Sequence, residues 1–75
     1  MRPFARFYTS LDKADRMDFR KAAMPLLGIP NSTFYYRVHH GNMFPSDLLK
    51  IKHLLIKYGC TQEMLLSMGI MEQSR

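Results

Sequence analysis

The chain has 75 residues, of which 47% are hydrophobic, so it can fold as one compact domain and is not expected to be disordered. Its single cysteine, Cys60, excludes an internal disulfide framework, and the sequence has neither a secretory leader nor the roughly 18 apolar residues of a membrane span, which predicts a cytoplasmic protein without a membrane partner. The net charge of +5 and the isoelectric point of about 9.7 favour an acidic partner such as nucleic acid.

Two helices are predicted in the first third of the chain. The first spans residues 3–13, where apolar side chains recur at the spacing of one helical face. The second begins at about Asp15 or Arg16 and ends at Leu27, with Gly28 as a left-handed C-cap. Pro25 removes one backbone donor and is expected to disturb its last turn.

The third helix is predicted over residues 33–40. Asn31 or Ser32 can cap its N-terminus. Phe34 and Val38 are four residues apart and therefore face the same way. The aromatic residues at its centre have a high strand propensity, but the cap and the glycine that follows favour a helix.

Two more helices are predicted in the second half. One begins at a Ser46 cap and continues to Tyr58, where Gly59 ends it. The other begins at Thr61. Its inward-facing residues are expected to be Met64, Leu65 and Met68.

Together these segments predict an all-α fold, a compact bundle of four to five short helices that forms one domain over residues 1–75. No linker or internal repeat divides it. Residues from several helices are expected to be buried in one core. They are Phe19, Leu27, Ile29, Phe34, Val38, Ile51 and Leu55.

Residues 16–41 have the pattern of a helix-turn-helix. A small residue, Ala23, lets two helices cross closely, Gly28 supplies the positive φ of a sharp turn, and Ile29 packs under that turn. The apolar residues of the second helix are then expected to face inward. Its outer face is left free to enter a DNA major groove.

The segment LGIPNSTFYYRV, residues 27–38, resembles the turn of many bacterial helix-turn-helix proteins, including Fis-like domains and transposase N-termini. The following HHGNMFPSDLLKIKHLLIKYGCTQEMLL resembles the second half of lambda-repressor-like (Cro/cI, XRE) domains. The resemblance covers residues 19–66. It implies sequence-specific binding of double-stranded DNA by a small transcriptional regulator of a bacterium, phage or mobile element, acting alone or as a homodimer.

The outer face of the second motif helix carries the candidate DNA contacts. Asn31, Ser32 and Thr33 lie at its N-terminus, where backbone N–H groups and the helix dipole favour a phosphate. Tyr36 and Arg37 are expected to face outward, and Arg37 could form a fork onto guanine or hold a phosphate. His40 is expected on the same surface.

The charge distribution adds candidate phosphate ligands. Residues 1–41 contain seven Lys or Arg against three Asp, which gives +4, whereas residues 42–75 contain four against three acids, which gives +1. No acidic residue lies between residues 19 and 46. Such a one-signed stretch is typical of a phosphate-binding surface, and it contains Arg20, Lys21 and His39.

Several alternatives stay open. A generally basic protein would show the same charge, and a helix-turn-helix fold could serve as a protein-interaction or structural module without DNA readout. Tyr35 is favoured as a half-buried core residue with an exposed hydroxyl, and Tyr36 suits either role. The methionines near the C-terminus, Met64, Met68 and Met71, suit core packing or a homodimer seam.

No pattern predicts catalysis. The sequence has no Ser-His-Asp arrangement, no phosphate-binding glycine loop and no paired carboxylates outside a solvated helix, so no enzyme activity, cofactor or small-molecule substrate is expected. His39, His40, His53 and Cys60 lack the spacing of a compact zinc site, so no metal is expected. Cys60 is expected to be a small buried hydrophobic residue.

Overall fold

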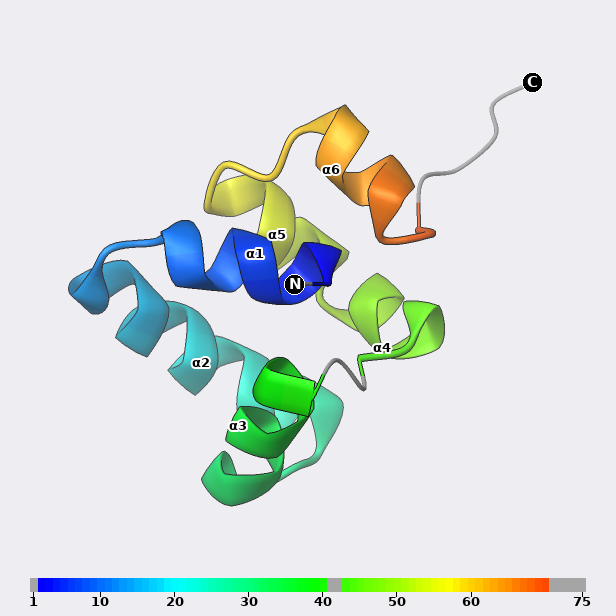
Figure 1. Cartoon of the computed structure of the whole chain (residues 1–75). Coiled ribbons are helices and arrows are strands. Elements are labelled where there is room, and N and C mark those ends of the chain that lie inside the picture. Colours follow the sequence, from blue (N-terminus) through cyan, green and yellow to red (C-terminus); the bar gives the residue numbers. More distant parts are fainter. Residues whose placement is uncertain (1, 41–42, 71–75) are drawn as a thin grey trace.

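The computed structural model describes residues 2–40 and 43–70 (Figure 1). These residues form six helices and no strand, which confirms the predicted all-α class with one helix more than expected. The helices are α1 (Pro3–Ser10), α2 (Lys13–Leu27), α3 (Asn31–His40), α4 (Pro45–Lys50), α5 (Lys52–Lys57) and α6 (Gln62–Ser67).

The corner between α1 and α2 comes earlier than the sequence pattern predicts. α1 ends at Ser10, Leu11 adopts an extended conformation, and Asp12 is already the N-cap of α2. The Oδ1 atom of Asp12 accepts a hydrogen bond from the Asp15 backbone N–H at 2.8 Å, which satisfies a donor at the helix N-terminus. α2 therefore starts at Lys13, two residues before the expected start.

The turn between α2 and α3 forms as predicted at Gly28. α2 continues through Pro25 to Leu27, and Gly28 then adopts φ 68° and ψ 33°, the left-handed conformation that glycine favours. The backbone N–H groups of Gly28 and Ile29 both donate to the Met24 carbonyl, at 2.8 and 3.2 Å. The helix end is thus satisfied without any side chain.

The expected helix over residues 46–58 is in fact two helices. The break lies at Ile51, whose φ of −118° and ψ of 21° depart from helical values. Around it the N–H of Ile51 donates to Leu48 and the N–H of Leu54 donates to Ile51, both three residues back, which is the tighter 3₁₀ pattern. α4 also begins two residues earlier than a Ser46 cap predicts, because Phe44 holds the cap position and Pro45 is the first helical residue.

An aromatic cluster fills the centre. The ring of Phe19 in α2 is fully buried and lies 5.6–6.1 Å, between centroids, from the rings of Phe4, Phe7, Tyr8 and Tyr58. These are mostly edge-to-face contacts, the arrangement that aromatic quadrupoles favour. The cluster therefore links α1, α2 and the end of α5.

The predicted core is confirmed at five of its seven positions. Phe19, Phe34, Val38, Ile51 and Leu55 are buried. Leu27 and Ile29 are half-buried at the edge of the same core, because they flank the exposed turn.

Burial in and before α6 agrees only in part with the prediction. Leu65 and Met68 are buried, but Met64 is exposed, so its predicted inward orientation is wrong. Leu65, about 100° of helix rotation further on, faces the core in its place. Cys60 is buried, as predicted. Met71 lies outside the described residues.

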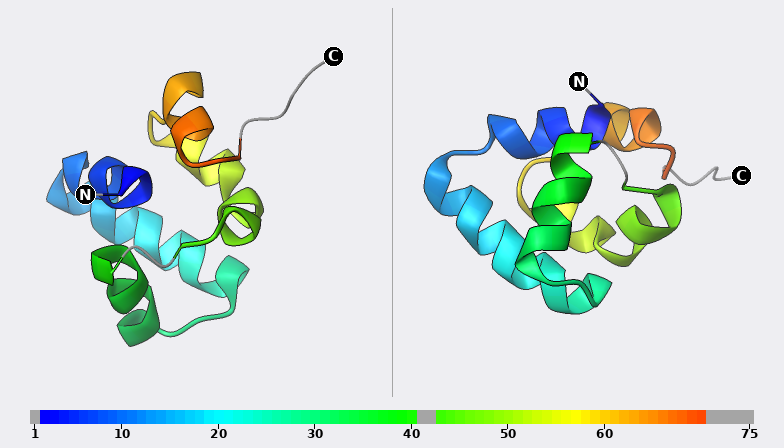
Figure 2. Two further views of the ribbon diagram at one scale, coloured as in Figure 1. Left: turned by 45° about the vertical axis from the view of Figure 1, so that its right-hand side comes forward. Right: turned by 60° about the horizontal axis from the view of Figure 1, so that its bottom comes forward.

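The packing leaves one side of α3 uncovered. α1 contacts α3 and α6, whereas α2 contacts α3, α4 and α5. With the bottom of the molecule turned forward, α3 lies across the front, with α1 above it, α2 to one side and α4 to the other (Figure 2). α3 therefore presents its outer face to solvent along its length.

Candidate nucleic-acid interface

The outer face of α3 is a continuous exposed stripe. Its members recur at the spacing of one helical face, and we call them the α3 face. They are Ser32, Tyr35, Tyr36, His39 and His40. Phe34 and Val38 occupy the opposite, buried side. The predicted outward orientation of Ser32, Tyr36 and His40 is therefore confirmed.

The N-terminus of α3 differs from the prediction in detail. The helix already begins at Asn31, and its first turn is closed by the Phe34 N–H, which donates to the Pro30 carbonyl at 3.0 Å. Asn31 and Ser32 are therefore helical residues rather than caps. Both are exposed, whereas Thr33 is half-buried and turned partly inward, contrary to its predicted outward orientation.

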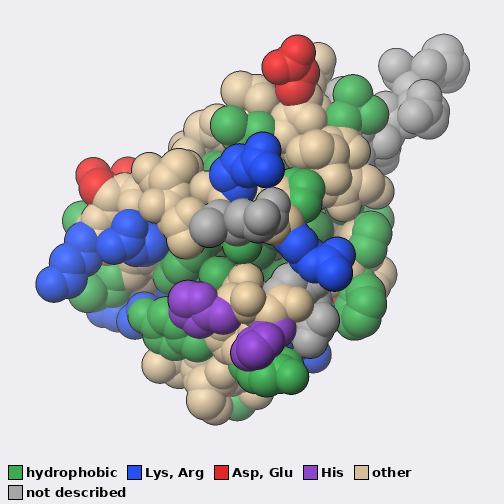
Figure 3. Space-filling model, in the orientation of Figure 1, with side chains coloured by type: hydrophobic (Ala, Val, Ile, Leu, Met, Phe, Trp, Pro, Cys, Tyr) green, Lys and Arg blue, Asp and Glu red, His purple; other side chains and the backbone are tan. Residues whose placement is uncertain are grey.

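Four rings form two pairs on the α3 face. Tyr35 and His39 are stacked, with centroids 5.9 Å apart and ring planes inclined by 7°. Tyr36 and His40 are 4.3 Å apart and inclined by 32°. Figure 3 shows the two histidines close together on this face, with Lys and Arg side chains around them. The stripe is therefore aromatic, and all four rings can donate hydrogen bonds.

Arg37 does not belong to the α3 face. Its side chain is half-buried, and its Nη1 donates to Oδ2 of Asp47 at 3.2 Å in an ion pair with α4. The predicted fully outward orientation of Arg37 is wrong, because residue 37 is rotated by about 100° from residue 36. That rotation turns Arg37 toward the carboxylate in the first turn of α4.

Tyr35 belongs to the α3 face, although the sequence pattern favoured it as a half-buried core residue. Its side chain is 40% exposed, and its hydroxyl accepts a hydrogen bond from Arg20 Nη1 at 3.1 Å. The Arg20 guanidinium carbon lies 5.5 Å from the centre of the Tyr35 ring, a cation–π distance. Arg20 and His39, two predicted phosphate ligands, thus meet at Tyr35, whereas Lys21 is exposed on α2 and has no hydrogen bond or ring contact with Tyr35 in the described structure.

Lys13 and Arg16 are two further cations that the sequence pattern missed. With Arg20 they line a cavity of about 270 Å³ beside the α3 face. The signal was present, since residues 13, 16 and 20 recur at helical spacing. It was missed because α2 was expected to begin after Lys13.

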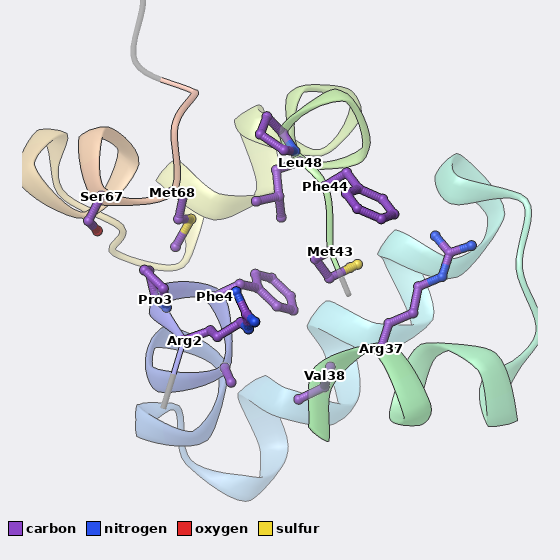
Figure 4. Close-up of a pocket in the computed structure, with 12 residues that line it drawn as sticks. Arg2, Pro3, Phe4, Arg37, Val38, Met43, Phe44, Leu48, Ser67 and Met68 are labelled. Carbon is purple, nitrogen blue, oxygen red and sulfur yellow. The ribbon is translucent and has the colours of Figure 1, made fainter. Parts of the chain in front are cut away.

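A second cavity, of about 260 Å³, lies between α1, α3, α4 and α6 (Figure 4). Its walls are mainly apolar, with Phe4, Val38 and Leu48 among them. Arg2 and Arg37 are the charged residues among the described lining. The lining offers hydrophobic contact and positive charge, and it brings together no acid–base or nucleophile pair.

Two buried groups have perturbed acidity. Burial raises the pKa of the Tyr8 hydroxyl, an effect that Tyr35 reinforces and Arg20 and Arg16 oppose. Burial also raises the pKa of the Cys60 thiol, which disfavours the reactive thiolate. Neither residue belongs to the α3 face.

Residues 2–40 and 43–70 contain no group of three or more His, Cys, Asp or Glu side chains arranged to hold a metal ion. No helix within these ranges is both long and apolar enough to cross a membrane. Comparison with protein-family models, with curated proteins and with solved structures found no match.

Proposed function

We propose that the protein binds double-stranded DNA and places the α3 face in the major groove, as a small transcriptional regulator would. The observation that carries the proposal is the exposed α3 face itself, which follows a three-residue turn and contains no acidic residue. In Figure 3, Lys and Arg side chains lie above the histidines of this face and to either side of them. This arrangement favours a polyanion over a neutral ligand.

The contacts follow from the side chains available. Asn31 and Ser32 stand at the positive end of the α3 dipole and can hold a phosphate together with backbone N–H groups. Tyr36 and His40 lie further along the same side and can donate to base edges. Arg37 is engaged with Asp47, so we infer that phosphate contacts supply most of the affinity. A homodimer on a repeated site would then supply specificity.

A pair of matched substitutions tests the proposal. Ser32→Glu adds a negative charge to the second residue of α3, and Ser46→Glu adds the same charge to the second residue of α4. Both positions are exposed, and a negative charge at the N-terminus of a helix interacts favourably with the helix dipole, so both variants should fold. Fluorescence anisotropy with a labelled duplex should show salt-sensitive binding that Ser32→Glu weakens much more than Ser46→Glu does. Absence of duplex binding by the parent protein at low salt overturns the proposal.

A second candidate function is binding of a protein partner. It is favoured by large apolar side chains in solvent, among which Phe44 is 60% and Leu66 is 57% exposed. A module of this kind would bind no duplex at low salt, and its association would strengthen rather than weaken in sulfate. Sedimentation velocity in the two conditions distinguishes it from the DNA-binding function.

A further inference from the structure

The cavity beside the α3 face is lined by positively charged side chains and by no carboxylate among the described residues. It lies between α1, α2 and α3, measures about 270 Å³ and is lined in part by Lys13, Arg16 and Arg20. Among the described residues, no carboxylate lines it, although Asp15 and Asp18 belong to the same helix. The side chains of residues 13, 16 and 20 share one side of α2, and the two aspartates are offset from it. Three cations thus converge without a protein counter-charge.

The two arginines are held in place at the cavity walls. Arg16 Nη1 donates to the Leu11 carbonyl at 2.6 Å, where α1 has just ended. Arg20 Nη1 donates to the Tyr35 hydroxyl at 3.1 Å and lies over the Tyr35 ring. Each guanidinium keeps further N–H donors that these contacts do not use. The two guanidinium groups are therefore positioned before any ligand binds, and some of their N–H donors remain available to it.

One of these donors has no acceptor. The Nε–H of Arg20 is buried and, within the part of the chain that the structure describes, has no hydrogen-bond partner. Buried polar groups in proteins are nearly always paired, so an orphaned donor indicates a missing ligand or water. A guanidinium presents two parallel N–H groups, here the Nε–H and one Nη–H, that match the oxygens of a phosphate.

We infer that this cavity binds a phosphate group, and that a backbone phosphate of DNA occupies it when the α3 face enters the major groove. The assignment of this phosphate to DNA rests on the proposed function. The binding of a phosphate group by the cavity is inferred from the cavity residues alone. Arg20 forms the fork, Lys13 supplies charge at the N-terminal end of α2, and Tyr35 and His39 join the cavity to the α3 face. The cavity therefore extends the DNA contact from α3 onto α2.

Inorganic phosphate tests whether the cavity binds a phosphate group, and a DNA duplex tests whether that phosphate belongs to DNA. Inorganic phosphate is added to the ¹⁵N-labelled protein, with chloride at equal ionic strength as the control, and the Arg20 Nε–H resonance is followed by NMR. Phosphate should move this resonance, and the backbone N–H resonances of the cavity residues Tyr35 and His39, more than chloride does. In Arg20→Lys, which keeps the charge but loses the fork and its Nε–H, the Tyr35 and His39 resonances should respond equally to the two anions.

Duplex binding is then measured over a range of salt. Lys13→Gln should reduce the slope of log K against log salt by about one, whereas Lys50→Gln, an exposed lysine on α4 outside the cavity, should leave it unchanged. Both substitutions are on exposed residues and should leave the fold intact. Arg20→Lys, which keeps the charge but loses the guanidinium fork, should also weaken duplex binding.

Each outcome decides one part of the inference. Equal effects of phosphate and chloride on Arg20, with equal salt slopes for Lys13→Gln and Lys50→Gln, overturn the phosphate site and leave the proposed function standing. A phosphate response without any duplex binding overturns the proposed function and the DNA source, and supports the phosphate chemistry of the cavity.

Discussion

The guanidinium of Arg37 donates a hydrogen bond from Nη1 to Oδ2 of Asp47 at 3.2 Å, and this ion pair joins α3 to the first turn of α4. The two side chains are 29% and 19% exposed, so the pair is only partly shielded from water. Its expected contribution to stability is about 0–1 kcal/mol. Its larger effect is to hold the Arg37 side chain against α4 and away from the α3 face.

Asp47→Asn should release Arg37 toward DNA. The substitution removes the partner of the guanidinium, so duplex affinity should rise and the salt slope should steepen by about one phosphate contact. Glu63→Gln is the matched control, because it removes a carboxylate from the first turn of α6 and changes the net charge equally. Equal gains in affinity for the two variants would show that Arg37 makes no contact of its own.

Phe19→Ala should nearly unfold the protein. The side chain is fully buried and contacts four other rings, and truncation of a buried phenylalanine costs about 3–5 kcal/mol. Domains of this kind have a free energy of unfolding of only about 5–15 kcal/mol. Thermal unfolding followed by circular dichroism measures the loss. Leu26→Ala, on the same helix but 46% exposed, should change the free energy of unfolding by less than about 0.5 kcal/mol.

Gly28→Ala isolates the backbone requirement of the turn. A Cβ atom added at Gly28 would meet no heavy atom within 4 Å, so the penalty comes from its φ of 68° alone. That penalty is about 1–2 kcal/mol for alanine. Asparagine tolerates this conformation better, so Gly28→Asn should be the milder change in urea unfolding. A larger loss for Gly28→Asn would point to a steric conflict that the structure does not contain.

Stability should fall in alkaline solution. Burial raises the pKa of Cys60 above its ordinary value of 9.0 and that of Tyr8 above 10.0. The folded state therefore keeps these protons at a pH where the unfolded chain has begun to release them. The free energy of unfolding is unaffected below the ordinary pKa values and declines as the pH rises above them. The melting temperature should fall above about pH 9. Cys60→Ala should flatten the earlier part of the decline and Tyr8→Phe the later part; unchanged profiles in both variants would contradict the assignment.

The helical fold could be predicted because its signals are local. Gly28 needs a positive φ, Thr61 caps α6 by accepting from the Met64 N–H at 3.2 Å, and Phe34 and Val38 mark the buried side of α3. Each of these depends on neighbours within four residues. The interruption at Ile51 could not be predicted, because the apolar spacing continues unbroken across it and only tertiary packing sets the bend.

The candidate site could be predicted only in part. Helix periodicity placed Tyr36 and His40 outward, but it could not show that Asp47 would face Arg37 from another helix. Tyr35 was missed for the same reason, since its exposure and its contact with Arg20 depend on how α2 packs against α3. Contacts between helices distant in sequence decide which of several outward-facing side chains remain available.

Tyr36→Ala is the sharpest test of the α3 face. The side chain is 57% exposed and its described ring contact is with His40 on the same helix, so its loss should change the melting temperature little. Loss of one hydrogen bond to DNA corresponds to about 1 kcal/mol, or a roughly fivefold weaker affinity. Leu66→Ala is the control, because Leu66 has the same exposed fraction on α6.

Tyr36→Phe then identifies the atom responsible. If the hydroxyl donates to a phosphate or a base, Phe and Ala should weaken duplex binding equally, since both lack that donor. If the ring instead packs on a thymine methyl group, Phe should keep the parental affinity while Ala loses it. The first result is expected, because the hydroxyl is the only donor on an exposed side chain whose ring is already engaged by His40, 4.3 Å away. Should neither variant weaken binding more than Leu66→Ala does, the DNA contact lies on a different face of the protein.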